Sequence, residues 1–123
     1  MTAFADADSL PPQQIWDGIL GRTIHGERIT LSLLELEPNC VVPEHSHANE
    51  QVGLLIEGSV EFTIGDETRT VRPGGSWKIV GHVPHSVVVG LDGAIIVEVF
   101  SPVRDDWQER PYEEPRPPRW PHV

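Results

Sequence analysis

The chain has 123 residues, which is the size of one domain and leaves little room for a second. Its 19 Asp and Glu outnumber its 9 Lys and Arg and give a formal charge of −10 at pH 7, which would repel phosphates. We therefore expect neither a nucleic-acid surface nor an anionic membrane surface. A small anionic substrate inside a pocket is still compatible with this charge, because a metal and an arginine can dominate a local field.

The first residues and the cysteine content bear on the compartment. Cys40 is the single cysteine, so no disulfide can form within the chain, which fits a reducing compartment. Residues 1–8 hold neither a basic segment nor a long apolar run, unlike a signal peptide. No stretch approaches the ~20 apolar residues that a membrane-spanning helix needs. We expect a cytoplasmic protein.

Taken in chain order, the pattern begins with a segment that lacks hydrophobic periodicity. Residues 1–14 contain a Pro11-Pro12 pair, and we expect a flexible arm there. Short apolar runs then predict strands, and glycine-containing pairs between them predict turns. The predicted strands are 28–36, 52–56, 60–64, 67–72, 76–80, 86–91 and 94–100. The predicted turns are Glu57-Gly58, Gly65-Asp66, Pro73-Gly74-Gly75 and Asp92-Gly93.

Roughly eight short strands at regular spacing, with almost no helical period, predict an all-β sandwich or barrel over residues 15–104. A parallel α/β sheet would need helical crossovers, which the pattern lacks. Only the segment 102–110 is compatible with a helical turn. Residues 105–123 are rich in proline and predict an extended tail laid on the barrel or on a partner subunit.

The histidines provide the first chemical signal. His45 and His47 are two residues apart, and alternate residues of a strand face the same side. Two imidazoles on one face near a barrel interior form half of a metal site, although exposed strands also carry such pairs. The pattern gains weight from the residues that follow it, which are Gln51, Gly58, Pro73-Gly74 and Pro84-His85.

This combination resembles the two motifs of the cupin superfamily over about residues 28–104. The first motif, His-x-His followed by Glu and then Gly, matches His45-Ser46-His47, Gln51 and Gly58, and the second matches the stretch from Pro73 to His85. The resemblance implies a cupin barrel, that is, a jelly roll or double-stranded β-helix. It also implies one divalent transition metal ion (Ni, Zn, Mn or Fe) on His45, His47, Gln51 and His85.

The sequence departs from the family pattern at the glutamate position. Gln51 has the strand parity of His45 and His47, whereas Glu50 has the opposite parity, so we favour Gln51 as the ligand, through its amide oxygen. A turn at residues 48–49 could reset the parity, which leaves Glu50 as the alternative. Three imidazoles and one amide are neutral, so a bound ion would keep its full charge and favour an anionic ligand.

A second group of residues resembles the pectin-degradation cupins called KdgF, which open unsaturated uronates. Their acid, usually Asp, and their Phe and Arg fall by motif on Glu98, Phe100 and Arg104. The resemblance implies that Glu98 is a general acid or base, that Phe100 shapes the pocket and that Arg104 clamps the substrate carboxylate. The alternative for Arg104 is a surface salt bridge with Asp105 or Asp106.

The resemblance therefore implies an enzyme that opens an unsaturated uronate, a small anionic sugar acid, to its linear keto form. An Fe(II)-dependent dioxygenase and a non-catalytic binding cupin are the alternatives. We also expect a homodimer formed through the outer sheet or the tail. His82 is expected at the pocket rim or in solvent rather than among the ligands, because Pro84 lies between it and His85. The tryptophans Trp16, Trp77 and Trp107 are expected to serve packing.

Overall fold

The computed structural model describes residues 2–121, so the last two residues of the predicted tail lie outside the described part. Within that part the chain forms eight strands, one 3-10 turn and one short helix. The strands are β1 (Gln13–Trp16), β2 (Ile19–His25), β3 (Thr30–Leu36), β4 (Val41–His45), β5 (Glu50–Ile64), β6 (Glu67–Val71), β7 (Ser76–Ile79) and β8 (His85–Ser101). The turn is η1 (Ala7–Ser9) and the helix is α1 (Asp105–Gln108). The predicted all-β fold and the helical turn after the last strand are both confirmed.

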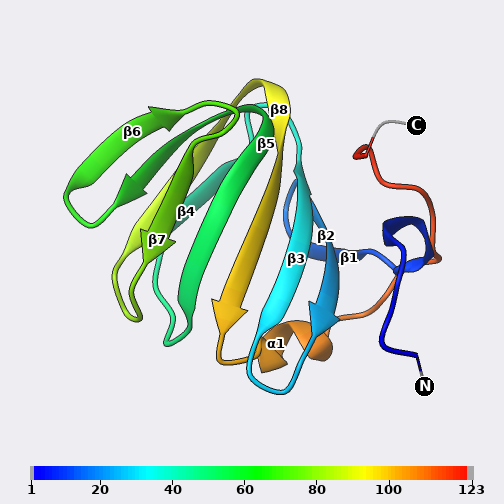
Figure 1. Ribbon diagram of the computed structural model, residues 1–123. Helices are drawn as coiled ribbons and strands as arrows, with labels where there is room; N and C mark the ends of the chain where they lie inside the picture. Colours follow the sequence, from blue (N-terminus) through cyan, green and yellow to red (C-terminus); the bar gives the residue numbers. More distant parts are fainter. Residues whose placement is uncertain (1, 122–123) are drawn as a thin grey trace.

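The strands form two layers that share β5 and β8 (Figure 1). All pairings are antiparallel. The first half of β8 pairs with β4 and the second half with β3, while β5 pairs first with β7 and then with β6. Because β5 and β8 also pair with each other through both halves, they carry the chain from one layer to the other. Helix α1 follows at the end of the molecule where β8 finishes.

Two of the predicted turns are wrong, and the reason is a bend shared by the two long strands. Glu57-Gly58 lies inside β5 and Asp92-Gly93 lies inside β8, where the pairing register shifts instead of ending. Gly58 and Gly93 have φ angles of 84° and 72°, which suit a bulge that bends a strand. A Cβ atom at Gly58 would lie 2.0 Å from the carbonyl oxygen of Gly93, so only glycine allows this approach.

This bend yields a stability prediction. Gly58→Ala should lower the free energy of unfolding by clearly more than Gly74→Ala does, as measured by urea denaturation. Both glycines have positive φ, which costs about 1–2 kcal/mol for alanine. Only the new Cβ atom at residue 58 also meets backbone, since nothing lies within 4 Å of one at residue 74. Equal losses would mean that the close approach of β5 to β8 does not limit stability.

The terminal segments pack on the barrel. The segment expected to be a loose arm contains η1 and the first two residues of β1. Gln13 is fully buried, and its side-chain amide donates to the carbonyl oxygens of Trp107 (2.7 Å) and Arg110 (3.0 Å). Further along the tail, the amide of Glu113 donates to Pro12. The tail therefore lies along the barrel, while the boundaries at residues 14 and 104 stay a prediction.

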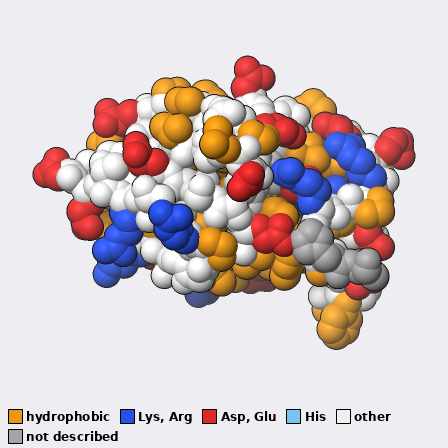
Figure 2. Space-filling model, turned by 90° about the horizontal axis from the view of Figure 1, so that it is seen from above, with side chains coloured by type: hydrophobic (Ala, Val, Ile, Leu, Met, Phe, Trp, Pro, Cys, Tyr) orange, Lys and Arg blue, Asp and Glu red, His pale blue; other side chains and the backbone are white. Residues whose placement is uncertain are grey.

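The outer surface is mixed in character. Seen from the end away from α1, acidic side chains are scattered among hydrophobic ones (Figure 2). The outer face of three neighbouring strands carries apolar side chains in cross-strand register. These are Leu31 and Leu33 of β3, Val97 and Val99 of β8, and Val52 and Leu54 of β5. None of the helices in residues 2–121 has the length and hydrophobicity needed to span a bilayer.

Candidate metal centre and its cavity

One cavity inside the barrel collects the predicted site. It has a volume of about 270 Å³, slightly below the roughly 300–1,000 Å³ of pockets that hold drug-sized ligands, so it suits one small molecule. Its walls are mainly apolar. All seven residues that the sequence predicts for the site line it, namely His45, His47, Gln51, His85, Glu98, Phe100 and Arg104.

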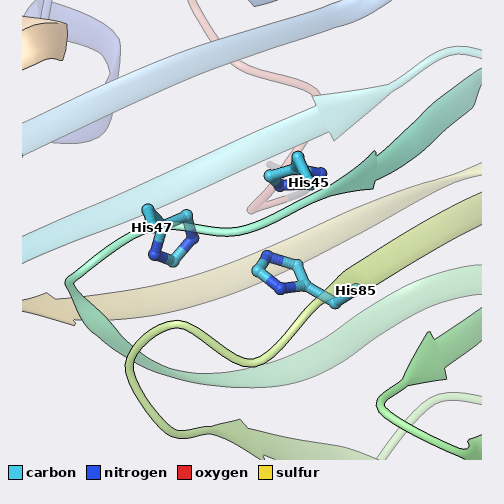
Figure 3. Close-up of side chains that lie close together, drawn as sticks. All are labelled: His45, His47 and His85. Carbon is cyan, nitrogen blue, oxygen red and sulfur yellow. The ribbon is translucent and has the colours of Figure 1, made fainter.

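Three imidazoles face one another at this cavity (Figure 3). His45 ends β4, His47 lies in the loop before β5, and His85 begins β8. The register of β4 against β8 places His45 directly opposite His85. One ligand atom from each ring can be chosen so that all three lie within 4.8 Å of one another. The cluster could therefore hold a metal ion.

Each of the three rings directs the same nitrogen, Nδ1, at a backbone carbonyl oxygen. Every Nδ1 atom lies 2.9 Å from a backbone carbonyl oxygen, which can only accept. This contact places the ring proton of His45 and His85 on Nδ1, whereas Nε2 of His47 also faces an oxygen, Oε1 of Gln51. The carbonyls belong to Pro43, Asn49 and Val83. The Nε2 atoms of His45 and His85 then carry a lone pair, and that of His85 is buried without a hydrogen-bond partner among the described residues. Backbone carbonyls often orient metal-binding histidines in this way.

Burial also favours the neutral form of these rings. Desolvation lowers the pKa of His85 to about 4, and it lowers the pKa of His47 as well. Both rings are then uncharged at neutral pH, which is the form that binds metal ions through the free ring nitrogen without first releasing a proton.

Gln51 and Glu50 point to opposite sides of β5. Gln51 is 5% exposed, and its Oε1 atom lies 3.0 Å from Nε2 of His47. Its Nε2 atom donates to Oε2 of Glu98. Glu50 is exposed and does not line the cavity. The amide oxygen of Gln51 therefore lies next to the histidine cluster, whereas the carboxylate of Glu50 does not.

Glu98 lies on the inner side of β8 and is 4% exposed. Its Oε2 atom accepts hydrogen bonds from Gln51 and from Nε1 of Trp77, the latter at 2.8 Å. No hydrogen bond from the described residues reaches Oε1, which leaves that oxygen available to the cavity. Burial raises the pKa of Glu98, whereas the two hydrogen bonds and the charge of Arg104 act in the opposite direction.

Arg104 follows β8 and lies over aromatic rings at the edge of the cavity. Its guanidinium carbon is 4.0 Å from the ring centroid of Trp107 and 4.8 Å from that of Phe100. Its Nε and Nη2 atoms donate to the two carboxylate oxygens of Asp106 at 3.0 and 2.8 Å, which lowers the pKa of Asp106. The salt bridge weighed as an alternative is thus present, yet the Arg104 side chain is 11% exposed and still lines the cavity.

The fold and these residues agree with a sequence comparison. The profile of the family described as Cupin domain matches residues 32–100, more than half of the chain. The chain belongs to the cupin family.

Known proteins similar to this cupin include two that are named KdgF. The pectin degradation protein KdgF of Dickeya dadantii (strain 3937) is 26% identical over 102 residues, which cover 81% of this chain and 93% of the relative. The structure of KdgF from Halomonas sp. has a TM-score of 0.79 at 23% identity and covers 86% of this chain and 98% of that one. An RmlC-like cupin from Shewanella frigidimarina NCIMB 400 has a TM-score of 0.80 at 20% identity, covering 86% and 96%.

Several residues of the cupin's cavity have roles that the sequence did not predict. Trp77 and Trp107 were expected only to pack, but one donates to Glu98 and the other supports Arg104. Asp106 and Arg110 also line the cavity. The spacing of three between Arg104 and Trp107 in a short helical turn is the signal that could have indicated their contact. His82 is exposed and does not line the cavity, as expected.

Proposed function

We propose that this cupin is a metal-dependent enzyme that opens the ring of a 4,5-unsaturated monouronate to the linear 5-keto-4-deoxy form. The observation that carries the proposal is the single cavity onto which the histidine cluster, Glu98 and Arg104 all face. The likeness to the pectin degradation protein KdgF of Dickeya dadantii supports a sugar acid as the class of substrate.

The proposed ligands of one divalent transition metal ion (Ni, Zn, Mn or Fe) are Nε2 of His45, His47 and His85 and Oε1 of Gln51. The contact of 3.0 Å between His47 and Gln51 supports this set. With the proton of His47 on Nδ1, where it reaches the carbonyl oxygen of Asn49, and with the amide nitrogen of Gln51 directed at Glu98, the contact joins two lone pairs. Such a pair repels unless both groups face a cation. When bound, the ion supplies a Lewis acid for a substrate oxygen.

Three residues of the chain are proposed to bind the substrate, exclude water and transfer protons. Arg104 has five N–H donors, and Asp106 occupies only its Nε and Nη2 edge, so the rest of the guanidinium is free for the substrate carboxylate. Phe100, 2% exposed and packed on Trp107 with ring centroids 4.8 Å apart, forms an apolar wall that excludes water. The free Oε1 atom of Glu98 moves the proton.

The reaction proposed is an isomerisation that needs no second reactant. The hydroxyl on C1 loses a proton, the bond between C1 and the ring oxygen breaks, and C4 gains a proton as the enol becomes the ketone. Glu98 can serve both proton transfers, accepting one proton and delivering one.

The decisive experiment follows the ultraviolet absorbance of the conjugated double bond of an unsaturated monouronate, which ring opening to the ketone removes. Metal-loaded protein should accelerate the loss of absorbance over the spontaneous rate, and metal-free protein should not. No acceleration by fully loaded protein would overturn the proposed reaction and leave the dioxygenase and the binding cupin as readings of the same site.

The role of Arg104 makes a separate prediction in this assay. Arg104→Ala should raise KM by about 10- to 100-fold with a smaller effect on kcat, as expected for losing a charged hydrogen bond of about 1.5–3 kcal/mol. Arg116→Ala is the matched control, because Arg116 is half-exposed on the tail and pairs with Glu113 away from the cavity. An unchanged KM in Arg104→Ala would show that Arg104 does not bind the substrate carboxylate.

We also propose that the cupin is a homodimer of the cytoplasm. The apolar outer face formed by Leu31, Val99 and Val52 supports the dimer, because exposed apolar patches often mark contacts between subunits. The lone Cys40, which excludes a disulfide within the chain, supports a reducing compartment.

A further inference from the structure

Three residues on neighbouring strands form a row on the inner side of the barrel. Gly53 of β5 is directly opposite Trp77 of β7 on one side and Glu98 of β8 on the other. Because Gly53 has no side chain, the indole of Trp77 lies over it, and a Cβ atom there would be 2.4 Å from the ring. Trp77 thereby reaches across a whole strand and donates from Nε1 to Oε2 of Glu98.

The position of the indole is fixed by packing. Trp77 is 8% exposed, and its ring centroid lies 5.0 Å from that of Phe62. A buried indole N–H needs an acceptor, and the carboxylate of Glu98 is the one it has. The hydrogen bond therefore restrains the carboxylate as much as the indole.

Glu98 in turn determines how the amide of Gln51 is oriented. Its Oε2 atom accepts from the amide nitrogen of Gln51, which leaves the amide oxygen facing His47. Turning the amide over would place its oxygen against the carboxylate and its N–H groups against the histidine cluster. The carboxylate of Glu98 thus selects the orientation in which Gln51 offers an oxygen to a cation.

We propose that Trp77 is a positioning residue for the metal centre. Lying across Gly53, it holds Glu98 so that the Gln51 oxygen is directed at the three histidines and the second carboxylate oxygen stays free for the cavity. The inference rests on the proposed function in one respect, the ligand role of Gln51, and it is independent of the reaction.

The test measures metal affinity by competition with a chelator, using Co(II) without substrate. Trp77→Phe keeps an aromatic ring and removes the N–H group. We expect its affinity to fall by about tenfold, within the range of about 10- to 100-fold seen when groups that orient metal ligands are lost. In a Gln51→Ala background the same substitution should change the affinity by less than about twofold, because the ligand it positions is gone.

Two further measurements separate positioning from a general loss of structure. The visible absorption spectrum of bound Co(II) in Trp77→Phe should shift towards that of Gln51→Ala, since both weaken the same ligand. Gly53→Ala, which displaces the indole, should lower the affinity as Trp77→Phe does. Gly26→Ala should leave it unchanged, because the nearest atom to its Cβ is 3.4 Å away.

An equal loss of affinity from Trp77→Phe in the wild-type and Gln51→Ala backgrounds would overturn the proposal, as would no loss in either. Absence of Co(II) binding by the wild type would overturn it together with the proposed metal site. If the affinities behave as expected and uronate is not converted, the proposed reaction fails and the positioning role stands. If uronate is converted and Trp77→Phe has wild-type affinity, the positioning role fails and the proposed reaction stands.

Discussion

His85→Ala should reduce the metal content from about one ion per chain to less than about a tenth of that, because a metal site with few protein ligands depends on each of them. The buried Nε2 atom of His85 has no other partner among residues 2–121, and its ring is neutral at pH 7. Elemental analysis of the purified, dialysed protein measures the result. Equal metal content in wild type and variant would contradict the proposed set of metal ligands.

The controls for this variant follow from burial and backbone conformation. His85 is 2% exposed, so the melting temperatures of the metal-free proteins should be compared as well. His47→Ala, at a less buried position, should lose the ion with a smaller effect on folding. His82→Asn is the matched histidine control and should keep the ion. Asparagine is chosen because residue 82 has a φ of 69°, which asparagine tolerates better than alanine.

Glu98→Gln should slow the conversion of the unsaturated uronate by about 100-fold or more, the usual size of a lost general acid–base group. The new amide can still offer an oxygen to the donors of Gln51 and Trp77, but it cannot accept and release the proton. The rate should be measured at saturating substrate by the loss of absorbance, on protein loaded with metal to the wild-type level.

The outcome is interpretable only if the metal centre is intact. The metal content of Glu98→Gln is therefore measured in the same preparation, and Glu61→Gln, an exposed glutamate on β5, serves as the control that should keep full activity. A wild-type rate in fully loaded Glu98→Gln would remove this residue from the mechanism while leaving the metal site unaffected.

Much of the fold was predictable because each signal was local. The predicted apolar runs correspond to β3, β5, β6, β7 and β8, and the turns at Gly65-Asp66 and Pro73-Gly74-Gly75 lie where they were expected, whereas β1, β2 and β4 were not predicted. The bend at Gly58 and Gly93 was not predicted either, because a glycine with positive φ serves a turn and a bulge equally well. Only the strand lying opposite decides between them, and a single sequence does not show that strand.

The same limit applies to the candidate site. The spacing of His45 and His47 predicted a shared strand face, but β4 ends at His45 and His47 lies in the loop before β5, so the loop brings the second imidazole to the first. The inward position of Glu98 was one of two open alternatives on an apolar strand. The role of Trp77 depends on the register of three strands, which places it beside Gly53 and Glu98. No local pattern contains that register, so Trp77 was predictable only as a packing residue.

One strand carries three of the seven proposed site residues and leads to a fourth. β8 begins with His85, contains Glu98 and Phe100, and ends three residues before Arg104, while it pairs with β3, β4 and β5. Amide protons in such a central strand exchange with solvent mainly when the whole domain unfolds. The site is therefore not expected to unfold locally while the rest of the domain stays folded. A bound ion should then slow hydrogen exchange along the full length of β8, not only near the histidines. At 100 times its dissociation constant it would add about 2.7 kcal/mol to the stability of the entire domain.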